Sequence, residues 1–150
     1  MRIVLLEPEI PQNTGSIARL AAATHTPLDL IGPLGFSLED RYLKRAGLDY
    51  WPWVDLAVHE SWQQYLDSSP PGRLIGFSAR ASRSYTQCAF RDGDRLLFGK
   101  ETRGLGPEVL EMLGEDVFTI PMTSPNVRSL NLSNAVSIVV YEARRQLGLV

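Results

Sequence analysis

The chain has a single cysteine, Cys88, and only two histidines, His25 and His59, among its 150 residues. An intramolecular disulfide is therefore excluded, which suits a reducing compartment such as the cytoplasm. A structural zinc site lacks ligands, because Cys88 has no second cysteine nearby and the two histidines are isolated in the sequence. We therefore expect a cytoplasmic protein that binds no metal.

Long apolar runs are also missing. The first seven residues hold too short an apolar stretch for a signal peptide, and no other stretch approaches the length of a membrane span. The chain has no Gly-x-Ser-x-Gly nucleophile motif, no P-loop and no glycine-rich dinucleotide fingerprint after its first strand-like segment. These absences argue against a membrane protein, an α/β-hydrolase and an ordinary nucleotide-binding enzyme.

Positive charge is not in excess, since 15 lysines and arginines face 17 aspartates and glutamates, for a net charge of -2. This balance argues against a protein whose whole surface attracts polyanions. The basic side chains do form small clusters. Such clusters are usually solvated surface, but they are also candidates for a local RNA site. They are Arg41, Lys44 and Arg45, then Arg80 and Arg83, then Arg144 and Arg145.

What the chain does contain is an alternation of short apolar segments with helical patterns. Strand-like segments span 3–6, 28–31, 54–58, 74–77, 96–98 and 117–120. Helix-like segments span about 17–24, 38–46, 61–66, 107–113 and 132–147, the last with apolar residues at i, i+3, i+4 and i+7. This alternation predicts a single α/β domain over residues 1–150, with a mostly parallel sheet flanked by helices.

Ligands of open α/β sheets bind beyond the carboxyl ends of the strands, and the loop 7–15 is unusual for such a place. It is stiffened by prolines, and either Asn13 or Thr14 is a candidate cap for the helix that follows. Arg19 falls about one turn inside that helix. The simpler alternative is that Asn13 is only a cap and Arg19 only a surface charge.

Two further loops have the same expected position. The loop 98–106 carries three glycines, which allow backbone groups to approach a ligand closely. The segment 120–134 is polar and leads into the last helix, and an N-terminal helix end favours anions. Capping accounts for only one of its polar residues Ser129, Asn131 and Asn134.

These loops resemble the motifs of the SPOUT class of RNA methyltransferases. The matching segments are Glu-Pro-Glu-Ile-Pro-Gln-Asn-Thr-Gly at 7–15 with Arg19, Phe-Gly-Lys-Glu-Thr-Arg-Gly-Leu at 98–105, Ile-Pro-Met at 120–122, and Ser-Leu-Asn-Leu-Ser-Asn-Ala-Val at 129–136. The match covers essentially the whole chain and looks closest to the small tRNA (cytidine/uridine-34) 2′-O-methyltransferases. The resemblance implies the SPOUT fold, an α/β domain with a deep C-terminal trefoil knot, which is a rare exception to the usual topology rules.

The resemblance further implies that the knot binds S-adenosyl-L-methionine through backbone groups and releases S-adenosyl-L-homocysteine. Arg19 matches the family's arginine that acts on the ribose hydroxyl, and the other catalytic motif positions fall on Asn13, Glu101 and Asn131. A guanidinium normally stays protonated, so we expect Arg19 to hold a phosphate and orient the hydroxyl rather than to accept its proton. The implied cofactor-binding residues are Phe77, Ser78, Gly99, Glu101, Gly104, Ile120, Met122, Ser129, Leu130 and Asn134.

The implied substrate is the ribose of the wobble nucleotide of tRNA, with leucine isoacceptors expected, bound as the anticodon stem-loop by a homodimer. No DNA or membrane partner is expected. Unpaired bases stack on aromatic or arginine side chains. The candidates for substrate binding are Arg41, Lys44, Arg45, Arg80, Arg83, Tyr141 and Arg144. Three alternatives stay open: action on another RNA such as ribosomal RNA, a non-catalytic RNA-binding protein on the same fold, and an unrelated nucleotide-binding α/β enzyme.

Overall fold

The computed structural model describes residues 1–150, apart from the side chains of residues 47 and 48. Its strands are β1 (Arg2–Leu6), β2 (Leu28–Ile31), β3 (Leu56–His59), β4 (Leu74–Phe77), β5 (Arg95–Phe98) and β6 (Val117–Phe118). Its α-helices are α1 (Pro11–Thr24), α2 (Arg41–Gly47), α3 (Trp62–Ser68), α4 (Pro107–Leu113) and α5 (Leu132–Gln146), and its 3-10 helices are η1 (Leu48–Trp53) and η2 (Tyr85–Gln87). The predicted α/β class is confirmed.

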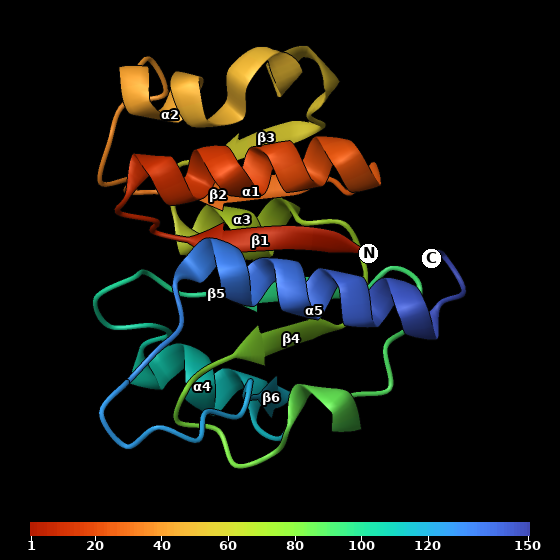
Figure 1. The fold of residues 1–150 in the computed structure, drawn as a ribbon. Coiled ribbons are helices and arrows are strands. Elements are labelled where there is room, and N and C mark those ends of the chain that lie inside the picture. The colour runs from red at the N-terminus through yellow and green to blue at the C-terminus, as the bar shows by residue number, and fades with distance from the viewer.

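The six strands form one parallel sheet between two layers of helices (Figure 1). Side chains alternate across a strand, so Ile3 and Leu5 of β1 face one layer while Val4 and Leu6 face the other. The first face packs against α1 and α5, and the second against α3 and α4. Burial on both faces explains why the strands appear in the sequence as short uninterrupted apolar runs.

The strand order β3-β2-β1-β5-β4-β6 places a switch in direction near the centre of the sheet. From β1 the chain moves outward to β2 and β3 on one side, then crosses to β4 on the other side. β5 then pairs with both β1 and β4 and fills the position between them. Ligands of such sheets bind beyond the carboxyl ends of strands at a switch of this kind. The loops after β1, β4 and β5 meet at that edge.

Helix α1 begins before Asn13 and Thr14, the two residues predicted as candidates for its N-cap. Ile10 is the N-cap and Pro11 is the first helical residue, a position where the missing proline N–H costs nothing. The prediction that Asn13 or Thr14 caps this helix is therefore wrong. Both residues lie buried inside the first turn instead. The side chain of Asn13 is left available for contacts outside its own helix.

Three other predicted boundaries shift by two or three residues. Helix α2 starts at Arg41 rather than at residue 38, because the Asp40 carboxylate accepts hydrogen bonds from the N–H groups of Tyr42 and Leu43 at 2.8 and 3.3 Å and caps the helix. The strand predicted at 54–58 is displaced to Leu56–His59. Strand β6 ends at Phe118 rather than at residue 120, since Thr119 leaves β4 and bridges to Ser84.

The three tryptophans have different surroundings. Trp51 packs against the core on the α1 and α5 face, and Trp62 stacks on Tyr65 with ring centroids 5.8 Å apart. Trp53 is 72% exposed and is the most accessible of the three. In the part of the chain that the structure describes, no helix is long and apolar enough to cross a bilayer.

The lone cysteine gives a simple test of the packing. Cys88 is 2% exposed, and burial raises the pKa of its thiol to about 11. Because the thiolate is the reactive form, we expect iodoacetamide at about pH 8 to leave the native protein unmodified and to label the urea-unfolded protein fully. Intact-mass spectrometry measures both. Rapid labelling of the native chain would contradict the buried position of Cys88.

Candidate active site

The loops after β1 and β5 are joined by the carboxylate of Glu101. It accepts hydrogen bonds from the backbone N–H groups of Glu9 at 2.8 Å and Ile10 at 3.1 Å. It also accepts one from Nδ2 of Asn13 at 3.3 Å. Ile10 has no polar side chain with which to cap α1, so Glu101 supplies the negative charge that a helix N-terminus favours. Glu101 is therefore a positioning residue in this structure.

The third loop joins this network through a pair of asparagines. Nδ2 of Asn131 donates to Oδ1 of Asn13 at 2.9 Å. Oδ1 of Asn131 in turn caps α5 by accepting from the N–H groups of Ser133 and Asn134 at 2.9 and 3.3 Å. Asn13 is only 7% exposed and uses both ends of its amide. The three unusual loops thus form one hydrogen-bonded unit, and Asn13 lies at its centre.

Two further contacts fix the loop after β5 against the loop after β1. Nζ of Lys100 lies 2.7 Å from the Glu7 carboxylate. The Glu9 carboxylate accepts hydrogen bonds from the hydroxyl and the N–H of Thr102 at 2.7 and 3.1 Å, and these bonds lower the pKa of Glu9 below its usual value. Glu9 therefore stays ionised and hydrogen-bonded at neutral pH, which makes it a poor proton acceptor for catalysis.

The loop after β5 closes as a tight turn that depends on glycine. The N–H of Gly104 donates to the carbonyl of Lys100 at 2.7 Å, and Gly104 has a φ of +65° that other residues rarely adopt. Gly99 lies directly against the returning chain, so that a Cβ at Gly99 would overlap the backbone of Gly104 and Leu105. The backbone of this turn forms one wall of a pocket.

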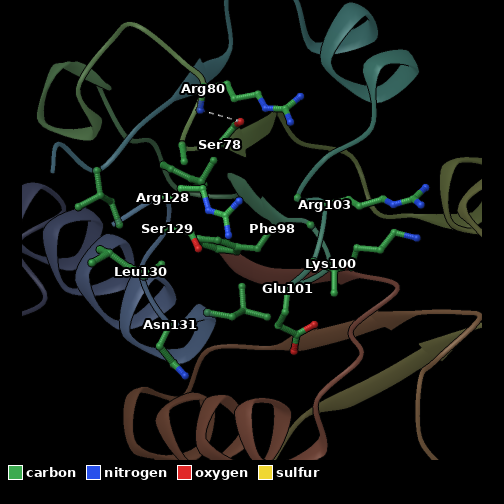
Figure 2. A pocket seen from close by; sticks show the side chains of 18 of the residues that line it. Ser78, Arg80, Phe98, Lys100, Glu101, Arg103, Arg128, Ser129, Leu130 and Asn131 are labelled. Atoms are coloured by element: carbon green, nitrogen blue, oxygen red, sulfur yellow. Dashed lines mark hydrogen bonds between the residues drawn. The ribbon is translucent and has the colours of Figure 1, made fainter. Parts of the chain in front are cut away.

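The pocket has a volume of about 790 Å³ and opens at the carboxyl edge of β4, β5 and β6 (Figure 2). Phe77 and Phe98 stack at its base with ring centroids 4.9 Å apart. Of the predicted cofactor-binding residues, those that line it are Phe77, Ser78, Gly99, Glu101, Gly104, Ile120, Met122, Ser129 and Leu130. Asn134 is exposed and lies outside the lining.

Among the predicted catalytic residues, Asn13, Glu101 and Asn131 also line this pocket, whereas Arg19 does not. Arg19 is exposed on α1, and its guanidinium carbon lies 5.1 Å from the centroid of the Tyr50 ring. In a single copy of the chain, most of the predicted cofactor-binding residues therefore lie together in the pocket, and Arg19 lies outside it.

The sequence prediction missed three cationic side chains of the pocket, Lys100, Arg103 and Arg128. All three lie within loops that the sequence had marked as unusual. The sequence did offer a signal for a cationic site. Glu101 is the only acidic residue in the segments 99–106 and 120–131, so these three basic residues have few acidic neighbours in the sequence. Figure 2 shows Arg128 directed across the pocket and Arg103 directed outward.

The predicted substrate-binding residues are spread over three regions. Arg80 lines the pocket and Arg83 lies in the same loop. Arg41, Lys44 and Arg45 belong to α2, and Lys44 is paired with Glu39. The remaining two are on α5, where Tyr141 is 51% exposed. Arg144, in contrast, donates to the carbonyls of Thr24 and Leu149 at 3.0 and 2.8 Å and ties α5 to the end of α1.

Replacing Asn131 with alanine tests how strongly the loops are coupled. Loss of the α5 cap alone costs about 1 kcal/mol, and the buried Asn13 carbonyl then also loses its donor, which adds about 1–3 kcal/mol. We expect a fall of about 2–4 kcal/mol in the free energy of unfolding, measured with urea.

Ser61→Ala is the matched control for this variant. Ser61 caps α3 by accepting from the N–H of Gln64 at 3.1 Å but joins no second loop, so only the cap energy of about 1 kcal/mol is lost. Equal losses in the two variants would show that the Asn13–Asn131 bond contributes nothing to stability.

No group of three or more His, Cys, Asp or Glu that could hold a metal ion occurs among residues whose side chains the structure describes. The pocket itself combines an apolar base, a backbone wall and a cationic rim. Such a pocket suits a flat heterocycle joined to a charged or zwitterionic group.

Comparison with known proteins gives a consistent result. A family model described as the SpoU rRNA Methylase family matches residues 1–141. The tRNA (cytidine(34)-2'-O)-methyltransferase of Saccharophagus degradans is 50% identical over 147 residues, covering 97% of this chain and 95% of that protein. The corresponding enzyme of Escherichia coli K12 is 47% identical, covering 99% of this chain and 94% of that protein.

A solved structure concerned with "the 2-OH methylation of C/U34 on tRNA" superimposes with a TM-score of 0.93 at 53% identity, covering 98% of this chain and 95% of that chain. The expected family of RNA methyltransferases is confirmed by these matches, which run over nearly the whole length of both partners. On its sequence and its fold, this chain belongs to the SpoU methylase family.

Proposed function

We propose that this protein is an S-adenosylmethionine-dependent methyltransferase that methylates the ribose 2′-hydroxyl of the wobble nucleotide, C or U, of tRNA. The observation that carries the proposal is the pocket at the carboxyl edge of β4 to β6. The loops that build it lie within a chain that matches tRNA (cytidine(34)-2'-O)-methyltransferases along 97–99% of its length.

The pocket fits the proposed cofactor. Its volume of about 790 Å³ lies within the usual range for small-molecule sites, and its base of stacked Phe77 and Phe98 suits an adenine ring. The guanidinium of Arg128, directed across the pocket in Figure 2, suits a carboxylate. The related methyltransferase AviRb of Streptomyces viridochromogenes, 26% identical with a TM-score of 0.86 over 98% of this chain and 60% of that chain, was solved in complex with AdoMet.

S-adenosylmethionine, held against the backbone wall and the rings of Phe77 and Phe98, would supply a methyl group from its positively charged sulfur to the ribose oxygen. S-adenosylhomocysteine would be left, and the hydroxyl proton would pass to water. The protein's contribution is alignment and electrostatics. The network of Glu101, Asn13 and Asn131 holds the walls of the pocket in place. Arg19 binds the phosphate beside the reacting ribose and so orients the hydroxyl.

Residues 1–150 act in this proposal as one SPOUT domain whose C-terminal part forms a trefoil knot, and the active form is a homodimer. Two observations support the dimer. Arg19 lies outside the pocket of its own chain, and α5 exposes Tyr141 beside its buried face. A second copy can bring an Arg19 to each pocket and cover the exposed side of α5. The proposed working compartment is the cytoplasm, where tRNA takes part in translation.

The experiment that tests the function is transfer of tritium from labelled cofactor to total RNA, followed by separation of tRNA from ribosomal RNA and by nucleoside mapping. We expect 2′-O-methylcytidine or 2′-O-methyluridine at the wobble position, with leucine isoacceptors as the expected substrates. A tRNA transcript with a deoxyribose at that position is the control and accepts no methyl group. Label confined to ribosomal RNA would redirect the assignment to the rival substrate, and absence of cofactor binding by calorimetry would overturn the enzyme assignment.

A further inference from the structure

The loops that follow β4, β5 and β6 are rich in positive charge, although the whole chain has a net charge of -2. The segments 78–84, 99–106 and 119–131 contain four arginines and one lysine, and Glu101 is their only acidic residue. Glu101 is held at the start of α1, and Lys100 is paired with Glu7. This edge of the sheet is therefore a local attractor for anions.

Its four arginines have no acidic partner within the part of the chain that the structure describes. They are Arg80, Arg83, Arg103 and Arg128. Elsewhere in the chain arginines such as Arg2, Arg73 and Arg145 are paired with Asp29, Asp94 and Glu142. Arginines without a carboxylate are most useful where an anion comes from outside the protein.

A second hollow, of about 610 Å³, adjoins the pocket along this edge. The two share Ser78 and Arg80, and Figure 2 shows the Arg80 side chain leaving the rim of the pocket toward α4. The lining of this second hollow comes from two parts of the chain. The loop after β4 supplies Ser78, Arg80, Ala81, Ser82 and Arg83, and the segment from α4 to β6 supplies Leu110, Gly114, Glu115 and Val117. Glu115 is the only acidic residue in its lining.

Arg83 is held in place before any ligand arrives. Its Nη1 donates to the carbonyl of Glu115 at 2.8 Å, and its guanidinium carbon lies 4.6 Å from the centroid of the buried Phe118 ring. Its backbone carbonyl accepts from the N–H of Thr119 at 2.8 Å. A guanidinium has five N–H donors, and a fixed one loses little side-chain entropy on binding. The remaining donors are available for an oxyanion.

We propose that this second hollow binds a backbone phosphate of the RNA strand that continues from the target nucleotide, with Arg83 as the fixed donor and Arg80 as the residue that joins it to the pocket. The inference rests on the proposed function, because the target ribose must lie at the mouth of the pocket. A phosphodiester matches the fork of donors that arginine presents and carries its charge at every nucleotide. The Glu115 carboxylate opposes this binding and limits its strength.

The test measures binding of an unmodified tRNA transcript at several salt concentrations for Arg83→Gln and Arg80→Gln, with Arg91→Gln as control. Arg91 is exposed in the loop before β5, at the opposite edge of the sheet. Each hollow variant is expected to bind about tenfold more weakly and to reduce the slope of log Kd against log salt by about one. The control leaves both unchanged, and Glu115→Gln strengthens binding. Cofactor affinity, measured by calorimetry, stays at the wild-type value in Arg83→Gln and in the control. Arg80 also lines the first pocket, so Arg80→Gln is judged by its salt slope.

A wild-type slope in both arginine variants would overturn the inference, and so would an equal loss of cofactor affinity, which would place these arginines in the cofactor site. If Arg83→Gln unfolds through loss of its bond to Glu115, Arg80→Gln decides the matter, because the Arg80 side chain donates no hydrogen bond in the described structure. Failure of the wild-type protein to bind or methylate tRNA would instead refute the proposed function. The wild-type measurement alone therefore separates failure of the proposed function from failure of this inference.

Discussion

Replacement of Arg19 by alanine is expected to lower the rate of methyl transfer to tRNA by about 10³-fold or more and to leave cofactor affinity unchanged. The two effects separate because Arg19 is exposed on α1 and contributes nothing to the lining of the pocket. An arginine that grips a phosphate in two places fixes the neighbouring ribose, and alignment of the reacting atoms carries much of the rate. Single-turnover transfer of labelled methyl and calorimetry of cofactor binding give the two measurements.

Arg19→Lys is the informative companion variant. It keeps the charge but loses the planar fork of donors, so a loss between those of the alanine variant and the wild type is expected. Arg91→Ala removes an exposed arginine remote from the pocket and serves as the control. Turnover close to normal in Arg19→Ala would remove this residue from the mechanism.

The proposed dimer gives the same residue a second test. Consider a mixed dimer of an Arg19→Ala chain and a chain whose pocket is disabled. If Arg19 acts at the pocket of the partner, the intact pocket of the first chain receives the intact Arg19 of the second. Mixing two inactive proteins would then restore activity. If Arg19 serves its own pocket, the mixture stays inactive, since neither chain holds both parts.

Most helices and strands of this fold could be predicted, because each has a recognisable pattern within its own stretch of sequence. The parallel strands are buried on both faces, so they appear as short apolar runs, and Leu28–Ile31 and Leu74–Phe77 were predicted to the residue. Helix α4 was equally clear, with Pro107 at its first position. The start of α1 was predicted too late for a physical reason. Its N-cap residue, Ile10, has no side chain that can cap the helix, so the sequence near the start carries no capping signal. Glu101, which lies 91 residues from Ile10, supplies the negative charge at this helix end.

The pocket was predicted as a set of residues, but its construction was not. Composition and resemblance identified Gly99, Glu101 and Asn131, because each lies in a loop with more polar or glycine residues than a turn requires. The hydrogen bond from Asn131 to Asn13 joins residues 118 positions apart, and periodicity within one sequence carries no information about such pairs. For the same reason the sequence alone does not predict that Arg19 lies outside the pocket.

The strongest structural prediction concerns Gly99. A Cβ at this position would occupy the same space as the carbonyl of Gly104 and the nitrogen of Leu105, all of them backbone atoms that no rotamer change can move. Gly99→Ala must therefore push apart the turn that forms a wall of the pocket. We expect a loss of about 1–3 kcal/mol in the free energy of unfolding and a fall of about 100-fold in cofactor affinity.

Three glycines in one loop allow steric and conformational causes to be separated. A Cβ at Gly106 would meet nothing within 4 Å, and its φ of -70° suits any residue, so Gly106→Ala is expected to be neutral or slightly stabilising. Gly104 also has open space, but its φ of +65° costs alanine about 1–2 kcal/mol. Cofactor affinity should therefore fall most in Gly99→Ala, less in Gly104→Ala and not at all in Gly106→Ala. If the loop needed glycine only for flexibility, all three variants would weaken binding alike, and the close approach of Gly99 to Gly104 would have no part in shaping the pocket.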